Sequence, residues 1–266
     1  MSVRVGLSSW SYSWAVGVKD HLPERPMDSF ALLAKAARLD VPVVQIADNL
    51  PLHDLPEAEL IRLGQEASRL GIAIEVGTRG VRTERIAQYV RIAEILGAKL
   101  LRTLLHDETG CPTLEQAERD IRMSLPLLEE HGVTLGIENH DFFHTTQIAS
   151  LVTRLDHPLA GVCLDPVNNM AQGESAPEVL AHLARHTVNF HCKDYTIRRK
   201  PTMLGFDVEG CPSGEGMLDL ARCVWSLPAD ISWVVELWTP WQGSLDATIA
   251  LEDDWATRSV AALKAL

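Results

Sequence analysis

Residues 161–194 read GVCLDPVNNMAQGESAPEVLAHLARHTVNFHCKD and contain one complete repeat of the pattern that decides the fold. An apolar run, Gly161–Leu164, precedes a segment with apolar residues at helical spacing, Ala176–His186. A second β-branched run, Thr187–Phe190, follows it directly. A strand, a helix and a strand in this order are typical of two parallel strands joined by a crossover helix.

The same alternation extends through the chain in both directions from this stretch. The strand candidates are Val3–Leu7, Val43–Ile46, Ile72–Val76, Lys99–Leu104, Val133–Ile137, Gly161–Leu164, Thr187–Phe190 and Ile231–Val235. The helix candidates are Asp28–Leu39, Leu55–Leu70, Thr83–Leu96, Thr113–His131, Thr145–Leu155, Ala176–His186, Met217–Trp225 and Ser244–Leu263. These units predict an α/β protein with a single (β/α)₈ TIM barrel, which needs roughly 250 residues. An open, doubly wound sheet is the alternative, but residues 8–12 (SSWSY) lack the G-x-G-x-x-G turn typical of it.

The composition is that of an ordinary globular protein, with 46% hydrophobic and 23% charged residues among 266. No linker rich in Gly/Ser or Pro divides the chain, so we expect one domain over residues 1–266. The formal net charge of −12 argues against a nucleic-acid partner. No apolar run approaches the roughly 18 residues of a membrane span, and the N-terminal MSVRVGLSSW lacks the apolar stretch of a secretory signal. We therefore expect a cytoplasmic protein without membrane contacts. Its five cysteines form no C-x-x-C pair, and we expect them to be reduced and mostly packed thiols.

Each of the last four strand candidates ends in a side chain that can bind a metal. These side chains are Glu138, Asp165, His191 and Glu236. The carboxyl ends of barrel strands meet at one mouth, where barrel enzymes place their chemistry. Three carboxylates and one imidazole suit a hard or borderline divalent ion. We therefore expect one divalent metal, Mn²⁺ in the first place, with Mg²⁺, Co²⁺ or Zn²⁺ as alternatives.

The segments around these four residues, GIENH, VCLDPVN, NFHCKD and VVELW, resemble the metal signature of the xylose isomerase-like TIM barrel superfamily, which includes sugar phosphate isomerases and epimerases. The resemblance covers nearly the whole chain and implies that Glu138, Asp165, His191 and Glu236 are the metal ligands. In the epimerases of this family, two glutamates face each other across the substrate, and one removes a proton that the other returns. The resemblance thus implies this catalytic role for Glu138 and Glu236, with the metal stabilising a cis-enediolate.

Two positions depart from the epimerase pattern. The D-x-x-H motif of the epimerases reads D-x-x-N here, with Asn168 as its fourth residue. The glutamate frequent at the end of the second strand is absent from residues 45–49 (QIADN). Both departures argue against a standard free-ketose epimerase.

Two arginines near the barrel mouth indicate an acidic substrate. Arg79 follows the third strand candidate, and Arg102 lies within the fourth. Arginine binds carboxylate or phosphate through paired N–H groups, so both are candidate substrate-binding residues. For Arg102 the alternative is a structural ion pair with Glu75 or Asp48.

Three further side chains are candidates for contact with the substrate. Lys193 lies two residues beyond His191 on the same face, where it would bind a substrate oxygen or donate a proton as a catalytic residue. A salt bridge to Asp194 is the alternative. His140 shares the parity of Glu138, and Asn168 replaces the histidine of the epimerase motif; both are assigned to substrate binding.

The loops after the first and last strands are rich in aromatic residues. They carry Trp10, Tyr12, Trp14, Trp238 and Trp241. Such rings can line a sugar pocket, and Trp14 is assigned to substrate binding. The alternatives are core packing and a subunit interface. The longest irregular stretch, residues 194–216, follows the seventh strand candidate and is predicted to be an active-site loop.

Enolate chemistry at a metal serves several reactions on this scaffold. The leading hypothesis is a divalent-metal-dependent isomerase or epimerase of a small ketose or keto-sugar. The alternatives are decarboxylation of a 3-oxo sugar acid, of the 3-oxo-isoapionate type, dehydration of a keto-inositol, and a role as the barrel subunit of a C-glycoside-cleaving complex. Endonuclease IV-type DNA repair conflicts with Asn168 and with the net charge of −12. The expected partner is a small sugar or sugar acid, and a homo-oligomer is left open.

Overall fold

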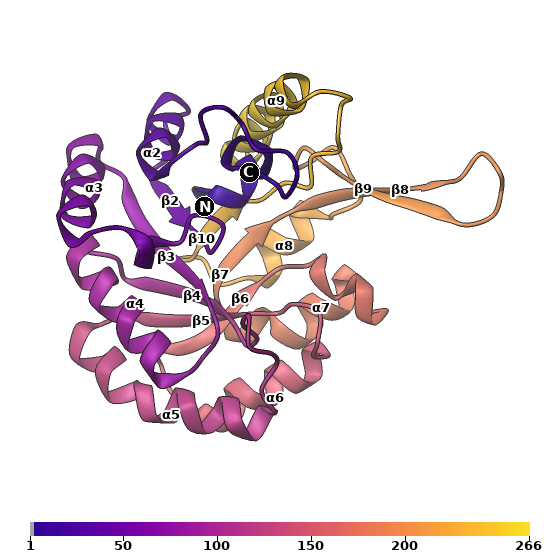
Figure 1. The fold of residues 1–266 in the computed structure, drawn as a ribbon. Coiled ribbons are helices and arrows are strands. Elements are labelled where there is room, and N and C mark those ends of the chain that lie inside the picture. The colour runs from indigo at the N-terminus through magenta and orange to yellow at the C-terminus, as the bar shows by residue number, and fades with distance from the viewer. Residues whose placement is uncertain (1–2) are drawn as a thin grey trace.

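Short β-branched segments pair in parallel and close into a barrel that helices surround (Figure 1). The computed structural model describes residues 3–266. Around the barrel the strands are β1 (Arg4–Ser8), β2 (Val43–Ile46), β3 (Ala73–Arg79), β4 (Leu100–Leu104), β5 (Thr134–Glu138), β6 (Ala160–Leu164), β7 (Thr187–Cys192) and β10 (Ser232–Val235). Strand β10 pairs with both β7 and β1, which closes the ring. The predicted eight-stranded TIM barrel is confirmed.

Eight of the helices begin and end close to the predicted residues, whereas the short helix α1 was not predicted. They are α1 (Ser13–Val16), α2 (Ser29–Arg38), α3 (Glu57–Leu70), α4 (Thr83–Leu96), α5 (Leu114–His131), α6 (Thr145–Leu155), α7 (Ala176–Leu183), α8 (Leu220–Ser226) and α9 (Leu245–Lys264). Side-chain caps explain where several helices begin. At the start of α5, for example, the Thr113 hydroxyl accepts a hydrogen bond from the backbone N–H of Gln116. The helix predicted from Met217 begins at Leu220 instead, because the Asp219 carboxylate caps it.

The apolar core lies between the barrel and its helices, while the barrel interior is polar. Outward-facing residues such as Leu101, Ile137 and Phe190 are fully buried in this core. Inside the barrel, Arg102 is paired in register with Gly77 on β3 and Gly136 on β5. Arg102 is only 3% exposed, so the interior of the barrel holds a buried charged side chain.

Residues 194–216 contain a β-hairpin, so the prediction of an irregular loop was wrong in this respect. Strands β8 (Asp194–Arg199) and β9 (Phe206–Cys211) pair antiparallel and project from the barrel rim (Figure 1, orange). Apolar and polar residues alternate along β8, and Ile197 faces Val208 across the pair. At the hairpin base the Asp194 carboxylate accepts backbone N–H groups of Gly214, Gly216 and Leu218 at 2.9–3.0 Å.

The described residues bear on two further expectations from the composition. Among the helices of residues 3–266, none has the length and apolar character needed to cross a membrane. All five cysteines are free thiols; Cys111 is exposed and the other four are buried. The expectation of packed thiols is thus confirmed for four of the five.

Candidate metal centre and active site

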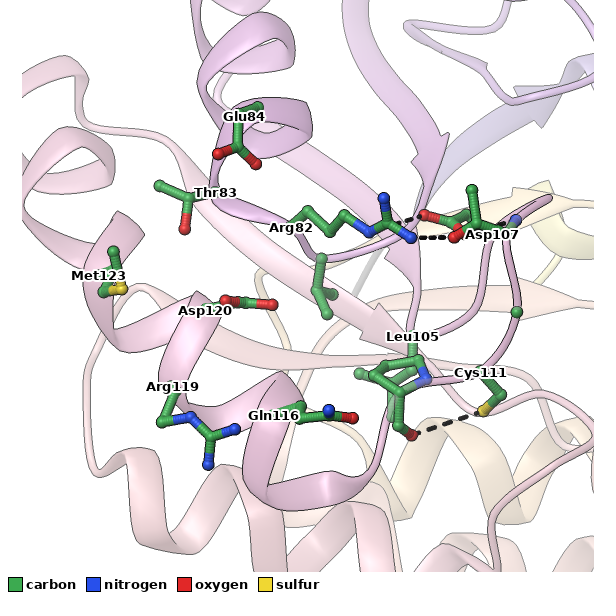
Figure 2. Close-up of a pocket in the computed structure, with 14 residues that line it drawn as sticks. Arg82, Thr83, Glu84, Leu105, Asp107, Cys111, Gln116, Arg119, Asp120 and Met123 are labelled. Carbon is green, nitrogen blue, oxygen red and sulfur yellow. Dashed lines mark hydrogen bonds and ion pairs between the residues drawn. The ribbon is translucent and has the colours of Figure 1, made fainter.

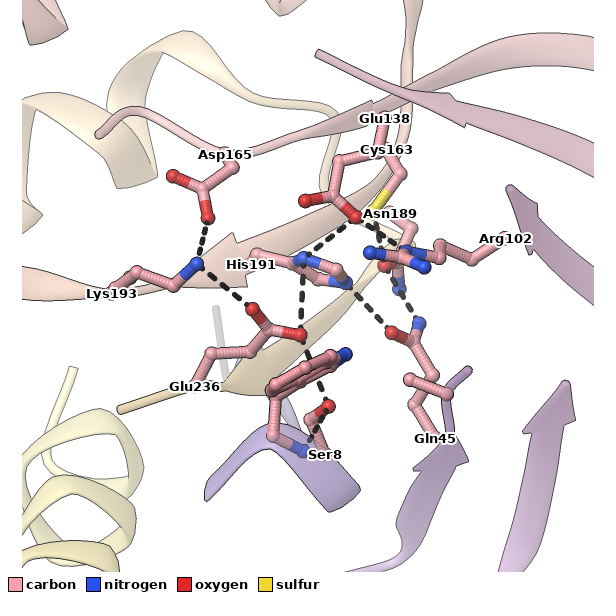
Figure 3. Close-up of polar contacts among 12 residues, drawn as sticks. Ser8, Gln45, Arg102, Glu138, Cys163, Asp165, Asn189, His191, Lys193 and Glu236 are labelled. Carbon is pink, nitrogen blue, oxygen red and sulfur yellow. Dashed lines mark hydrogen bonds and ion pairs between the residues drawn. The ribbon is translucent and has the colours of Figure 1, made fainter. Parts of the chain in front are cut away.

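The four strand-end side chains predicted to bind a metal meet inside the mouth of the barrel (Figure 3). Glu138 ends β5, Asp165 follows β6, His191 lies in β7 and Glu236 follows β10. Each offers a ligand atom, and these atoms all lie within 4.8 Å of one another. All four side chains are buried, with exposed fractions of 2% or less. The cluster combines the hard oxygen donors and the imidazole that suit a divalent metal.

The orientation of His191 supports this reading of the cluster. Its Nδ1 faces Glu138 Oε2 at 3.5 Å and Glu236 Oε1 at 3.4 Å, and it makes no hydrogen bond. Its Nε2 is hydrogen-bonded to Gln45 Oε1 at 2.7 Å. A buried ring nitrogen without a hydrogen-bond partner, aimed between two carboxylates, fits a metal ligand. The residues present therefore fit a divalent ion.

Lys193 contacts two members of this cluster. Its Nζ lies 2.8 Å from Asp165 Oδ2 and 3.0 Å from Glu236 Oε2. Burial disfavours the charged ammonium, but Asp165 and Glu236 outweigh burial and raise the pKa of Lys193. The alternative of a salt bridge to Asp194 was wrong, because the Asp194 carboxylate binds backbone N–H groups at the hairpin base. Lys193 is therefore held as a cation beside two carboxylates that are candidate metal ligands.

Arg102 is engaged entirely within the barrel. Its Nε pairs with Glu138 Oε2, and its Nη1 lies 2.6 Å from Asp48 Oδ1. Only 3% of its surface is exposed. Burial opposes ionisation of Glu138, but Arg102, His191 and Lys193 together outweigh burial and hold the pKa of Glu138 well below its usual range. The predicted ion pair of Arg102 with Asp48 is confirmed; among the described residues, Arg102 makes none with Glu75.

Arg79, at the end of β3, has a different environment. Its Nε pairs with Asp48 Oδ2, while 41% of its side chain remains exposed. Burial raises the pKa of Asp48, but Arg102 and Arg79 outweigh it and lower this pKa. Asp48 thus links the two guanidinium groups, and Arg79 is the one that reaches solvent.

A cavity of about 870 Å³ opens above the cluster. Of the predicted site residues, its lining includes Trp14, Arg79, Arg102, Glu138, His140, Asn168, Lys193 and Glu236. Asp165 and His191 are fully buried and lie outside this lining. The structure therefore brings the predicted catalytic and substrate-binding residues to one cavity.

The aromatic residues divide between this cavity and the core. Trp10, Trp14 and Trp238 line the cavity, and Trp14 Nε1 donates to the Thr239 carbonyl at 2.8 Å. Trp241 packs against Trp14, with ring centroids 5.2 Å apart. Tyr12 is fully buried, so the alternative prediction of core packing applies to this residue.

Asn168 and His140 occupy different positions around the cluster. Asn168 Nδ2 donates to Glu138 Oε1 at 2.8 Å, and Lys193 Nζ donates to Asn168 Oδ1 at 3.3 Å. Asn168 therefore connects Glu138, a candidate metal ligand, to Lys193. His140 lies at the rim, with its Nδ1 2.8 Å from Asp141 Oδ2. Both side chains remain candidates for substrate contact.

Sequence reasoning missed a group of polar residues beneath the cluster. Gln45, Glu75, Asn189 and Ser232 are buried and mutually hydrogen-bonded. Burial raises the pKa of Glu75, although its hydrogen bonds to Ser232 and Gln45 oppose this effect. A polar residue between apolar neighbours, as in VVQI (residues 43–46), was the available signal.

A second cavity, of about 550 Å³, lies beside the starts of α4 and α5 (Figure 2). It is lined in part by Arg82 and Asp107, whose ion pair measures 3.6 Å. It contains none of the metal-binding candidates. The cavity above the cluster is therefore the candidate active site.

The closed barrel and its strand-end cluster define the class of this protein. The chain belongs to the family of xylose isomerase-like TIM barrels, whose family model matches residues 33–265. Enzymes named as a decarboxylase and as epimerases are among its relatives and structural neighbours.

Three individual proteins illustrate the similarity. A 3-oxo-isoapionate decarboxylase of Pectobacterium atrosepticum is 34% identical over 261 residues, which cover 97% of this chain and 94% of the relative. D-psicose 3-epimerase of Clostridium cellulolyticum H10 superposes with a TM-score of 0.74 and 14% identity, covering 99% of each chain. A xylose isomerase-like TIM barrel protein of Mycobacterium smegmatis, solved with magnesium, gives a TM-score of 0.69 and 12% identity, covering 98% of this chain and 97% of the other. At these identities the two structural matches show a shared fold.

Proposed function

We propose that this protein is a divalent-metal-dependent decarboxylase of a 3-oxo sugar acid. The observation that carries the proposal is the 34% identity to 3-oxo-isoapionate decarboxylase along almost the full length of both chains. The leading sequence hypothesis, an isomerase or epimerase, rested on the metal cluster, which all these reactions share. The two departures from the epimerase pattern and the exposed Arg79 agree better with an acidic substrate.

The residues of the cavity suit the binding of such a substrate. Arg79 keeps 41% of its side chain exposed while Asp48 holds its Nε. Its remaining N–H groups are available for the substrate carboxylate. Glu138, Asp165, His191 and Glu236 would hold the divalent ion, which supplies Lewis-acid polarisation of the 3-oxo group.

Decarboxylation breaks the bond between the carboxylate carbon and the adjacent carbon. The electron pair of this bond moves toward the 3-oxo group, carbon dioxide leaves, and the adjacent carbon then needs one proton. Lys193 carries a proton at Nζ, since Asp165 and Glu236 favour its charged form. We assign Lys193 as the donor of this proton, which is afterwards replaced from water.

The test is an NMR time course in D₂O with Mn²⁺-loaded protein and a metal-stripped control. The substrate is 3-oxo-isoapionate labelled with ¹³C in its carboxylate. We expect the label to appear as carbon dioxide and bicarbonate, and one deuterium to enter the product beside its carbonyl. Deuterium exchange into free ketoses, with no loss of carbon from the sugar acid, would contradict the proposal and favour an epimerase.

Two variants test the assigned carboxylates. Glu138→Gln and Glu236→Gln each remove one charged ligand, and we expect each to lower turnover by about 100- to 10,000-fold. Circular dichroism is expected to show an unchanged fold. Glu215→Gln alters a surface carboxylate paired with Arg258 and provides the matched control with unchanged turnover. Full activity in both site variants would exclude a role for these carboxylates.

A further inference from the structure

The polar residues beneath the metal cluster form one connected network inside the barrel. Figure 3 shows the part of it that joins Asn189, Gln45 and His191. Gln45 Nε2 donates to Glu75 Oε2 and to Asn189 Oδ1, both at 3.1 Å. Asn189 Nδ2 donates to Glu75 Oε2 at 3.1 Å and to Ser232 Oγ at 2.7 Å. The network continues to His191, whose Nε2 meets Gln45 Oε1 at 2.7 Å.

The direction of these hydrogen bonds is determined by acceptors that cannot donate. Asn189 Nδ2 also lies 3.5 Å from the Ser232 carbonyl oxygen, which is only an acceptor. The amide group of Asn189 therefore points its nitrogen to Ser232 and its oxygen to Gln45. Gln45 consequently points its nitrogen toward Asn189 and Glu75, and its oxygen toward His191.

We propose that Gln45 is a positioning residue for the metal ligand His191, and that Glu75 and Asn189 keep the Gln45 amide in the required orientation. An amide oxygen facing Nε2 requires that Nε2 carry a proton. The lone pair available to a metal is then at Nδ1, the atom that faces Glu138 and Glu236. The inference rests on the metal site of the proposed function and is independent of the reaction catalysed there.

This assignment does not depend on the charge of Glu75. Both amide N–H groups reach its Oε2, whereas Ser232 Oγ reaches its Oε1. A proton on Oε1 would leave Oε2 as an acceptor, so the orientation of Gln45 would be the same. Removing the hydrogen-bond partner of a metal-binding histidine typically weakens metal binding by about 10- to 100-fold.

The wild-type protein provides the first test. In the Zn²⁺-loaded protein labelled with ¹⁵N in histidine, NMR is expected to show a protonated Nε2 and a metal-bound Nδ1 for His191. Its Nε2 proton is expected to be shifted downfield and protected from exchange by Gln45. A protonated Nδ1 with a metal-bound Nε2 would overturn the proposal without any substitution.

Two variants, Gln45→Leu and Thr103→Val, separate the positioning role of Gln45 from general damage to the barrel. Gln45→Leu removes the acceptor, and we expect the Kd for Mn²⁺, measured by EPR, to rise about 10- to 100-fold.

Thr103→Val provides the control for losing a buried hydrogen bond elsewhere in the barrel. Thr103 Oγ1 donates to the Gly80 carbonyl and contacts none of the network residues. We expect this variant to bind Mn²⁺ like wild type. Unchanged affinity in Gln45→Leu would overturn the proposal, as would an equal loss of affinity in Thr103→Val. Carbon dioxide release is measured separately, so failure here leaves the proposed decarboxylation untouched.

Discussion

Two arginines that look equivalent in the sequence have different environments in the barrel. Arg102 is buried between Glu138 and Asp48, and it neutralises charge that the interior could not otherwise hold. Arg79 shares Asp48 but keeps much of its side chain exposed at the cavity. The sequence placed both near the barrel mouth, yet spacing alone carries no information on which guanidinium is already paired.

Substitution by methionine distinguishes the two arginines. Arg102→Met leaves the buried Glu138 without its guanidinium partner and Asp48 with Arg79 alone, so we expect the free energy of unfolding in urea to fall by about 3–5 kcal/mol. Arg79→Met removes the charged contact proposed for the substrate carboxylate, so we expect KM for 3-oxo-isoapionate to rise about 10- to 100-fold with little change in stability. Equal loss of stability in both variants would contradict this division of roles.

The metal-binding candidates were accessible to sequence reasoning, whereas the residues that orient them were not. Asp165 and His191 each come at the end of an apolar run, and this pattern predicts their position at the end of a strand. The role of Gln45 depends on Asn189, which lies 144 positions away in the chain and across the barrel. Hydrogen-bond direction between distant residues is a tertiary property, and no local pattern encodes it.

At the scale of elements, periodicity predicted every barrel strand but missed the β8–β9 hairpin. The barrel strands are buried on both faces, so they appear as apolar runs between helices. The hairpin strands are largely exposed, and their apolar residues alternate with charged ones such as Arg198 and Asp207. This alternation is a weaker signal than an apolar run and resembles the sequence pattern of a loop. The hairpin still borders the site, because Val208 lines the cavity.

A buried carboxylate joins α9 to the segment that carries Trp14. Glu252 accepts the backbone N–H groups of Trp14 and Ala15 at 2.8 and 3.0 Å. Burial raises the pKa of Glu252 from 4.5 to about 7, although these two hydrogen bonds oppose the effect. The folded protein thus favours the protonated form, so the contribution to stability is complete below pH 4.5 and is lost as the pH rises through 7.

Glu252→Gln removes this titrating group. Comparison of the unfolding free energies of wild type and variant therefore isolates the contribution of Glu252. We expect the unfolding free energy of wild type, relative to Glu252→Gln, to fall by about 3 kcal/mol between pH 4.5 and pH 8. Urea unfolding of both proteins at several pH values measures this change, because the other titrating groups are common to both. A difference that stays constant with pH would show that Glu252 titrates at its ordinary pKa in the folded protein.

At the scale of the whole molecule, the barrel concentrates opposing charges at one point. Glu138, Asp165 and Glu236 converge there from three strands, and among the described residues Arg102 and Lys193 are the cations paired with them. In the unfolded chain these groups are far apart and hydrated. The proposed site for a divalent ion therefore exists only in the folded protein, which links binding of the ion to folding.

Metal binding should accordingly raise the thermal stability of the whole barrel. At a concentration about 100 times its Kd, an ion that binds only the folded state stabilises it by about 2.7 kcal/mol. For a chain of this size we expect Tm to rise by about 5–10 °C with Mn²⁺ and to return after chelation. Asp165→Asn should lose the shift, while Asp207→Asn, the same change on the exposed hairpin, should keep it. An equal rise in both variants, measured by differential scanning calorimetry, would show that Mn²⁺ stabilises the protein from another site.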